Sequence, residues 1–365
     1  MKVIVTAGGT GGHIYPALGI VEKIKECEPD SEFIYVGTTN RMEKDIVPKL
    51  GIKYVGIEMY GLSKNIVRDI KVALLILKNE RIIKKLIDDF KPDIVIGTGG
   101  YVTYPVIKAA KAKNVKTFIH EQNSIPGKSN RALARLADKV GVSFKDSIHY
   151  FDEKKAIFTG NPCSERALSI PMISRTKYGL SLDKKFVLMV QGSLGSTSVN
   201  AKMIEFLNSI DDKDYQVLYI TGKRSYDEFK KNNFSKNVFV VPYVENLAGL
   251  MKDADIIISR AGASSISEII ALKKLSILIP SPYVANNHQF FNALSCANNK
   301  AAIMIEEVSL TATVLKNQID KLLNDLEMQL NMKLNLSKMQ KNDSSTAIYG
   351  ILKELINDER KTSKN

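Results

Sequence analysis

The chain has 365 residues, 44% of them hydrophobic, which is enough to bury the cores of about two domains and argues against overall disorder. It carries 52 Lys and Arg residues against 39 Asp and Glu, a formal net charge of +13. Such an excess favours an anionic partner, which can be nucleic acid, an acidic membrane surface or a phosphate-rich substrate. The basic residues are spread along the chain and form no block typical of a nucleic-acid-binding tail, so we expect no nucleic-acid partner.

The cysteines and the first residues indicate the compartment. Cys27, Cys163 and Cys296 are far apart and lack metal-ligand spacing, which argues against a disulfide scaffold or a zinc site. Gly8 and Gly9 interrupt the first apolar run well before the length of a signal-peptide core, and no apolar stretch approaches that of a spanning helix. We therefore expect a cytoplasmic protein whose membrane contact is peripheral.

Short strands and helices alternate along the first part of the chain. A glycine-rich turn follows each of the first two strands. The predicted elements are strand 2–6, loop 7–13, helix 16–25, strand 93–96, loop 97–101, helix 106–113 and strand 117–120. This alternation is typical of a parallel, doubly wound sheet.

A second series of the same kind begins after Gly160-Asn161-Pro162. It starts with strand 186–190 and a glycine loop at 191–196, and residues 314–365 have the pattern of charged, amphipathic helices. The further predicted strands are 216–221, 238–241, 256–259 and 276–279.

These elements predict an α/β fold with two doubly wound Rossmann-like domains facing a central cleft. Ligands of such sheets bind beyond the carboxyl ends of the strands. We expect an N-terminal domain over 1–162, a C-terminal domain over 163–340, and a helix over 341–365 that packs back toward the N-terminal domain.

The glycine loops suit a diphosphate, because a glycine-rich turn before a helix offers backbone N–H groups and the positive end of the helix dipole. A single glycine turn is more often only tight strand-to-helix geometry. The first loop, Gly8-Gly9-Thr10-Gly11-Gly12-His13, lacks the dinucleotide-binding spacing and the lysine of a P-loop, which disfavours NAD and ATP.

Two polar groups follow predicted strands and can do acid–base chemistry. His13 closes the first loop, where an imidazole can take a proton from a hydroxyl or can simply bond the backbone at a helix entry. The run His120-Glu121-Gln122-Asn123 follows the strand end at Ile119. Several of its polar side chains are expected at the carboxyl edge of the sheet.

Two groups in the second half have both a structural and a functional interpretation. Ser265 and Glu268 have the spacing of a capping box, while a carboxylate such as Glu268 also suits the paired hydroxyls of a ribose. Asn287-His288-Gln289 is predicted to lie in a loop after Pro280 and Pro282, where it either reads sugar hydroxyls or is solvated.

Together these motifs resemble the GT-B glycosyltransferases, and among them the enzymes that add N-acetylglucosamine to lipid I in peptidoglycan synthesis. The resemblance covers nearly the whole chain. Its motifs are Gly8 to His13, Gly99-Gly100-Tyr101, His120 to Asn123, Gly160-Asn161-Pro162, Gly192-Ser193-x-Gly195, Arg260 to Glu268, and Asn287 to Ala293.

The resemblance implies an inverting transfer from UDP-N-acetylglucosamine to the 4-hydroxyl of an N-acetylmuramyl sugar, without a metal or other cofactor. It implies His13 as the base, with Glu121 as the rival, and Tyr101 and Asn130 as acceptor contacts. The donor-binding residues that it implies are Thr10, Gly11, Gly12, Asn123, Ser193, Ala263, Ser264, Ser265, Glu268 and Gln289.

The chain departs from the family pattern at two places. Cys163-Ser164-Glu165-Arg166 stands where the family has an arginine soon after the Gly-Asn-Pro turn, and Leu194 stands where it often has glutamine. Arg166 is the candidate to replace the missing arginine.

A lipid-linked acceptor implies docking on the cytoplasmic face of the cell membrane. Between residues 61 and 86, apolar residues at helical spacing alternate with basic ones, as interfacial docking on anionic lipid requires, although a buried helix with a solvated basic side has the same pattern. The docking residues that we predict are Ile66, Ile70, Leu74, Leu77, Lys78 and Arg81.

The implied partners are UDP-N-acetylglucosamine, lipid I, an anionic membrane surface, and proteins of cell-wall synthesis and division. Two alternatives stay open: a UDP-sugar epimerase, and a non-catalytic UDP-sugar-binding envelope protein. A Rossmann dehydrogenase is the weakest, because no ribose-binding acid follows a proper fingerprint.

Overall fold

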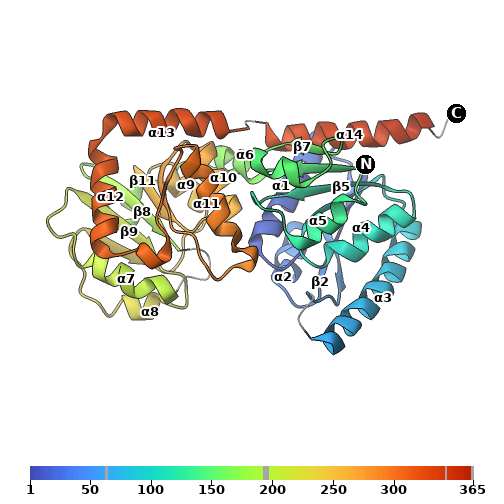
Figure 1. Ribbon diagram of the computed structural model, residues 1–365, viewed down its shortest axis with the longest axis horizontal. Coiled ribbons are helices and arrows are strands. Elements are labelled where there is room, and N and C mark those ends of the chain that lie inside the picture. The colour runs from blue at the N-terminus through green and yellow to red at the C-terminus, as the bar shows by residue number, and fades with distance from the viewer. Residues whose placement is uncertain (62–64, 192–196, 342, 363–365) are drawn as a thin grey trace. The chain divides into compact units, whose positions relative to one another are not determined.

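The computed structural model describes residues 1–61, 65–191, 197–341 and 343–362. The chain divides into two compact units (Figure 1). The first unit comprises Met1–Cys163 together with Lys341–Asn365, and the second comprises Ser164–Gln340.

The first unit contains a seven-stranded sheet whose neighbouring strands all pair in parallel, in the order β3-β2-β1-β4-β5-β6-β7. The strands are β1 (Lys2–Ala7), β2 (Glu32–Thr38), β3 (Lys53–Ile57), β4 (Ile94–Gly99), β5 (Lys116–Glu121), β6 (Lys139–Val142) and β7 (Ala156–Phe158). Its helices are α1 (Gly11–Cys27), α2 (Glu43–Ile46), α3 (Ile66–Phe90), α4 (Thr103–Ala112), α5 (Lys128–Ala134) and α14 (Ser344–Thr362). The strand order reverses between β1 and β4, which makes the loops after these strands the expected ligand site.

Helices cover both faces of this sheet, because successive side chains of a strand point to opposite faces. Val3 and Val5 of β1 pack in one core with α1 and α14, and Ile4 packs in the other core with α3 and α4. The sheet is therefore apolar on both sides, as parallel sheets are.

Helix α14 completes the first of these cores. Ile348, Leu352 and Ile356 are buried against it. Beside them, Glu28 accepts hydrogen bonds from Tyr349 Oη at 2.8 Å and Lys353 Nζ at 2.6 Å, and also from the N-terminal ammonium. The Lys353 bond is the largest of the effects that lower the pKa of Glu28 to about 2.

The second unit contains a six-stranded parallel sheet in the order β10-β9-β8-β11-β12-β13. Its strands are β8 (Lys185–Val190), β9 (Tyr215–Ile220), β10 (Val238–Val241), β11 (Ile256–Ser259), β12 (Leu275–Leu278) and β13 (Ile303–Met304). Its helices are α6 (Cys163–Ser169, from Ser164 on), α7 (Thr197–Leu207), α8 (Tyr226–Phe229), α9 (Leu247–Met251), α10 (Ala263–Ala271), α11 (His288–Asn298), α12 (Ala312–Asn324) and α13 (Leu326–Met339). The strand order reverses between β8 and β11.

The prediction of two Rossmann-like domains with parallel sheets is confirmed. The sequence analysis identified β1, β4, β5 and the first five strands of the second unit but left out β2, β3, β6 and β7. The run Phe33-Ile34-Tyr35-Val36 of β2 is rich in β-formers and buried, so it carried a signal for a strand. Among the described residues, no helix is long and apolar enough to cross a membrane.

Candidate active site

The loop after β1 is shaped by a buried carboxylate and by a neighbouring loop. Glu43 is fully buried and accepts hydrogen bonds from the backbone N–H groups of Gly9 and Thr38 and from Thr38 Oγ1. Gly100 follows β4 with a φ of +90°, and a Cβ there would lie 2.4 Å from the Gly8 carbonyl oxygen. The two glycine loops therefore meet backbone to backbone, and Thr10 and Gly12 remain exposed.

His13 lies in the first turn of α1, where this loop meets β4. Thr98 Oγ1 donates a hydrogen bond to its carbonyl oxygen at 2.7 Å. Its ring Nδ1 lies 3.1 Å from Oε1 of Gln122, which follows β5. A Cβ on Gly99 would lie 2.6 Å from the same Nδ1, so glycine is needed to admit the ring. The structure thus brings His13 together with the His120–Asn123 run.

Glu121 is buried and its carboxylate is saturated. Oε1 accepts from the backbone N–H and the side-chain Nδ2 of Asn123, and Oε2 accepts from the backbone N–H of Gly127 and from Nδ2 of Asn130. The four distances lie between 2.9 and 3.1 Å. Such a carboxylate organises the loop between β5 and α5, and its oxygens are occupied by donors of the protein itself.

The two residues expected on the acceptor side have different environments. Asn130 is buried, and its Nδ2 also contacts the His120 carbonyl oxygen, so its contacts are internal. Tyr101 is 56% exposed and its ring lies against Gly61, where a Cβ would come within 2.3 Å of Cζ. Tyr101 is the one of the two that can meet a ligand directly.

In the second unit, the loop after β11 leads straight into α10. The helix begins at Ala263 with Gly262 as its N-cap, so Ser265 lies inside the first turn and the predicted capping box with Glu268 is wrong. Ser267 Oγ instead donates to the Ala263 carbonyl oxygen at 2.7 Å. Backbone N–H groups of the first turn, at Ala263, Ser264 and Ser265, have no intrahelical acceptor, which suits them to bind an anion.

Glu268 lies on α10, one and a half turns into the helix. Burial raises the pKa of its carboxyl to about 7, and the positive charge of Arg166 on α6 opposes that rise. A carboxyl whose charge is poorly solvated and lightly compensated is typical of a ligand-binding position.

Gln289 and Asn292 connect α11 to neighbouring loops. The Asn287-His288-Gln289 run was expected in a loop, but α11 begins at His288, with Asn287 as a left-handed N-cap at a φ of 49°. Gln289 Oε1 accepts from the Ser281 N–H at 2.9 Å, and the buried Asn292 donates to the Ala261 carbonyl oxygen. The amides of α11 therefore brace the loops after β11 and β12.

Two residues near these loops, Glu43 and Glu307, escaped the sequence analysis. Glu43 holds the first glycine loop, and Arg260, which directly follows β11, forms a buried ion pair with Glu307 at 2.7 Å. Both contacts join residues that are far apart in the sequence, so no local sequence pattern predicts them. Ser193, expected near the donor phosphates, and the departure at Leu194 lie outside the described residues.

Comparison with known proteins gives the family. Residues 3–142 match the glycosyltransferase family 28 N-terminal domain, and residues 186–348 match the family 28 C-terminal domain. A protein of Bacillus cereus named UDP-N-acetylglucosamine--N-acetylmuramyl-(pentapeptide) pyrophosphoryl-undecaprenol N-acetylglucosamine transferase 1 is 42% identical over 362 residues, covering 98% of this chain and 100% of that protein. The chain belongs to glycosyltransferase family 28. A Bacillus pumilus transferase of the same name without the numeral is 40% identical, over 97% of this chain and 99% of its own.

Solved structures with this fold include both transferases and epimerases. The MurG of Acinetobacter baumannii matches with a TM-score of 0.79 at 24% identity, covering 97% of this chain and 99% of that one. A putative UDP-N-acetylglucosamine 2-epimerase from Listeria monocytogenes matches with a TM-score of 0.69 at 12% identity, covering 96% and 94%. At these identities the likeness concerns the fold alone.

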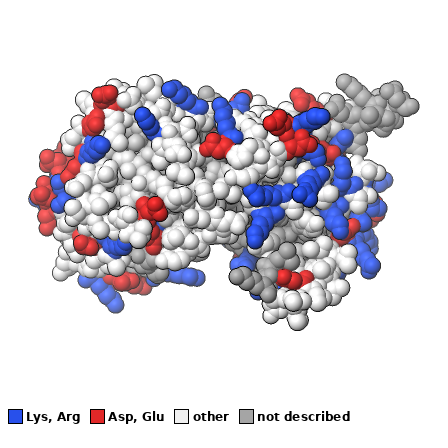
Figure 2. All heavy atoms as spheres, viewed as in Figure 1, with Lys and Arg blue, Asp and Glu red and all other residues white. Residues whose placement is uncertain are grey.

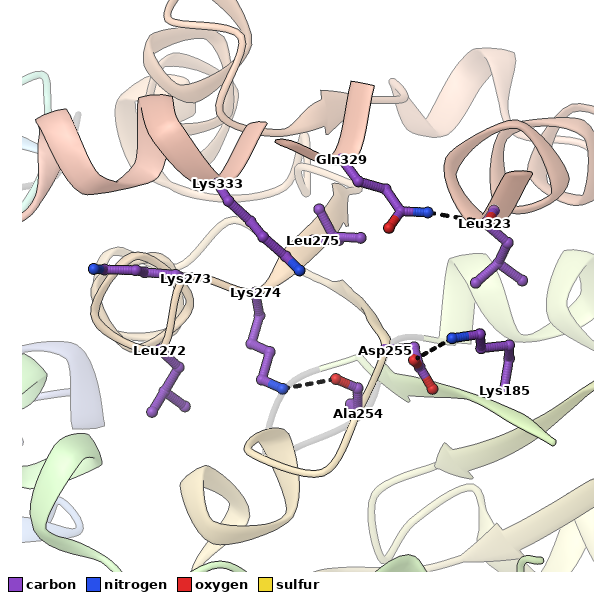
Figure 3. Close-up of a pocket in the computed structure, with 10 residues that line it drawn as sticks. All are labelled: Lys185, Ala254, Asp255, Leu272, Lys273, Lys274, Leu275, Leu323, Gln329 and Lys333. Atoms are coloured by element: carbon purple, nitrogen blue, oxygen red, sulfur yellow. Dashed lines mark hydrogen bonds and ion pairs between the residues drawn. The ribbon is translucent and has the colours of Figure 1, made fainter. Parts of the chain in front are cut away.

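A cavity of about 430 Å³ lies elsewhere in this family 28 chain, at the amino-terminal edge of the second sheet (Figure 3). Its wall includes Lys185 and Leu275, the first residues of β8 and β12. Lys185 Nζ pairs with Asp255, and Lys274 Nζ donates to the Ala254 carbonyl oxygen, so these two amines are already bound within the protein. The described loop between β11 and α10 lies at the opposite, carboxyl-terminal edge of this sheet.

Proposed function

We propose that this chain transfers N-acetylglucosamine from UDP-N-acetylglucosamine to the 4-hydroxyl of the N-acetylmuramyl-peptide of undecaprenyl-diphosphate-linked lipid I, which forms lipid II. The observation that carries this proposal is the 42% identity, over 98% of the chain, to a transferase named for that reaction. The epimerase alternative is supported by likeness of fold only.

His13 acts as the general base in this proposal. Its Nε2 takes the proton of the acceptor 4-hydroxyl while that oxygen attacks C1 of the donor sugar. The bond from C1 to the diphosphate oxygen breaks, its electron pair leaves with UDP, and the configuration at C1 inverts to a β-1,4 linkage. One base suffices, because no covalent enzyme intermediate forms. The saturated carboxylate of Glu121 makes it the weaker candidate.

The second unit supplies the donor contacts. The first-turn N–H groups of α10, at Ala263, Ser264 and Ser265, stabilise the negative charge that develops on the leaving diphosphate, as an oxyanion hole does. Glu268 accepts hydrogen bonds from the ribose hydroxyls, for which its weakly compensated carboxylate is suited. Gln289 contacts the N-acetylglucosamine.

The first unit supplies the remaining contacts. Thr10, Gly11 and Gly12 approach the donor diphosphate and sugar, Asn123 recognises the sugar, and Tyr101 meets the acceptor. Asn130 acts by holding Glu121 and the β5–α5 loop, because it is buried. The roles of Ser193 and Arg166 as donor contacts stay predictions.

Helix α3 docks the enzyme on the cytoplasmic face of the membrane. One side of α3 is buried through Val72, Leu75 and Ile83. The other side exposes the apolar docking residues of the sequence analysis, at 78% for Ile66, 57% for Ile70, 63% for Leu74 and 53% for Leu77. One apolar side of α3 packs against the rest of the protein. The other apolar side is therefore available to insert into the apolar part of a membrane.

Basic side chains lie beside this exposed apolar face on the same helix. Lys78 and Arg81 are exposed on the same helix. In Figure 2 the end of the first unit that carries the start of α3 is largely white, and Lys and Arg side chains gather higher on the unit, over α4 and α5. Apolar residues beside cations fit an anionic lipid surface. Cell-wall synthesis and division proteins stay predicted partners.

The transfer reaction is tested with labelled UDP-N-acetylglucosamine and a short-chain lipid I analogue. We expect label in a product with the acceptor lipid, none with a lipid-free acceptor, and a slower reaction with other UDP-sugars. Conversion of the donor to an epimer without an acceptor, or donor binding without transfer, would overturn the proposal.

Docking is tested separately with vesicles that contain anionic or only zwitterionic lipid. The double variant Ile70→Ser/Leu74→Ser should lose most binding to anionic vesicles while it keeps transfer to a detergent-dissolved acceptor. Leu182→Ser is the matched control, since Leu182 is 69% exposed in the other unit. Equal binding by the wild type and the double variant would remove α3 as the docking surface.

A further inference from the structure

A continuous line of hydrogen bonds connects the backbone at Gly160 to the ring of His13. His120 Nε2 lies 2.9 Å from the Gly160 carbonyl oxygen, and His120 Nδ1 lies 3.1 Å from Gln122 Nε2. Gln122 Oε1 in turn lies 3.1 Å from His13 Nδ1. His120 and Gln122 are both buried, at 0% and 1% exposure.

Backbone carbonyls fix the direction of every bond in this line. The Gly160 carbonyl can only accept, so the ring proton of His120 is on Nε2 and its Nδ1 is an acceptor. Gln122 must then present its NH₂ group to His120. The same NH₂ group lies 2.9 Å from the carbonyl oxygen of His120, and a flipped amide would place two acceptors against each other there. The oxygen of Gln122 therefore faces His13.

An amide oxygen can only accept a hydrogen bond, so the neutral ring of His13 carries its proton on Nδ1 and its Nε2 is unprotonated. A neutral imidazole without such a partner exchanges between both tautomers. Burial lowers the pKa of His120 to about 4, against the Gly160 bond that raises it, so His120 stays neutral near pH 7. The donor and acceptor roles in these three hydrogen bonds are therefore the same near pH 7.

We propose that His120 and Gln122 are positioning residues that hold His13 in the tautomer with a bare Nε2, the form that can accept the proton of a sugar hydroxyl. The inference rests on the proposed role of His13 as the base. It assigns to a neutral amide the orienting task that a carboxylate performs in hydrolase triads. The amide sets the tautomer without adding a negative charge beside the imidazole.

The first test is the tautomer itself, measured on the full-length protein labelled with ¹⁵N-histidine. The chain has four histidines, and the His13 signals are assigned by their loss in His13→Asn. At a pH where the ring is neutral, we expect Nδ1 to be protonated and Nε2 bare. A predominantly Nε2-protonated ring in the wild type would overturn the proposal whatever the activity.

The second test uses Gln122→Met, which keeps the side-chain length and removes the amide. We expect a mixture of His13 tautomers and a fall in kcat of roughly 10- to 100-fold, with the KM for UDP-N-acetylglucosamine little changed. Gln122→Glu keeps an acceptor for His13 Nδ1, so this nitrogen should stay protonated, but its second oxygen would face the Nδ1 and the carbonyl oxygen of His120, so we expect this variant to be less stable than the wild type. The control is Gln216→Met, which removes another buried glutamine, bonded to the Ser181 N–H on the second unit.

The outcomes separate this inference from the proposed function. An unchanged kcat in Gln122→Met would overturn the positioning role. Full activity in His13→Ala would instead remove His13 as the base, and the measured tautomer would then be a structural feature only. Thermal unfolding, compared with that of Gln216→Met, shows whether Gln122→Met folds. If it does not fold, the His13 tautomer measured in the wild type decides whether the proposal stands.

Discussion

The two units each carry a buried or half-buried glutamate at or beyond the carboxyl end of an inner strand, and the two carboxyl groups differ in their surroundings. Glu121 in the first unit accepts four hydrogen bonds from its own loop and helix α5. In the second unit, burial is the main influence on the Glu268 carboxyl and raises its pKa to about 7, and the charge of Arg166 opposes that rise.

This contrast indicates different uses of the same residue type. A carboxylate whose lone pairs are filled by the protein is a structural anchor, and it is expensive to alter. A carboxyl that is desolvated with few partners is unfavourable in the empty protein, and a ligand with hydroxyl donors relieves that cost. The resemblance to the family implied a role near the chemistry for both residues, and only the contacts distinguish them.

The largest effect is expected at His13, because loss of the base there decides whether Glu121 has only a structural role. His13→Ala should lower kcat by roughly 10²- to 10⁴-fold, because the base is lost, with donor affinity little changed. Steady-state transfer kinetics measure this, with His149→Ala, an exposed histidine of the same unit, as the control. A rate within a factor of two of the wild type would return the role of base to Glu121.

Next in size is the stability lost on changing the anchor. Each oxygen of the Glu121 carboxylate accepts hydrogen bonds from two N–H donors. In Glu121→Gln an NH₂ group replaces one of these oxygens and faces its two donors, so the free energy of unfolding should fall by about 2–4 kcal/mol. Urea unfolding measures the loss, and Glu153→Gln on the surface is the control. An unaltered midpoint would show that the four bonds do not act as an anchor.

A smaller effect is expected at the ligand-binding carboxylate. Glu268→Gln should weaken UDP-N-acetylglucosamine binding by about 10- to 100-fold, since hydrogen bonds to a charged group contribute about 1.5–3 kcal/mol, and it should leave the stability of the empty protein unchanged or higher. Calorimetric titration and thermal unfolding test both statements against the exposed Glu306→Gln. A loss of stability without a loss of affinity would make Glu268 a second anchor.

The smallest effect is the pH dependence of donor binding. The pKa of Glu268 is raised to about 7, so the carboxylate form increases as the pH rises through neutrality. If this form binds the ribose, affinity should increase by up to about tenfold between pH 6 and 8. The sugar nucleotide has no phosphate monoester that titrates in this range. Glu268→Gln should abolish the slope, and a slope of the opposite sign would contradict the assignment.

The sequence was sufficient to predict the strand–loop–helix repeats and the candidate site residues that belong to sequence motifs. Glycine loops and His13 are local signals, because tight turns and helix entries depend on adjacent residues. The capping box failed because Gly262 begins α10 earlier than the Ser265 spacing suggested. The His120–Gln122–His13 line joins two loops through partners 109 residues apart, which no single sequence displays.

The placement of α14 also has a consequence for synthesis on the ribosome. The first unit draws its core from both ends of the chain, and the residues of the second unit are translated in between. At about 5–20 residues per second, roughly ten to thirty-five seconds separate the emergence of the first sheet from that of α14. During that interval α1 has an uncovered apolar side, so the unit begun first is completed last, and a nascent chain halted before residue 344 is one that chaperones should recognise.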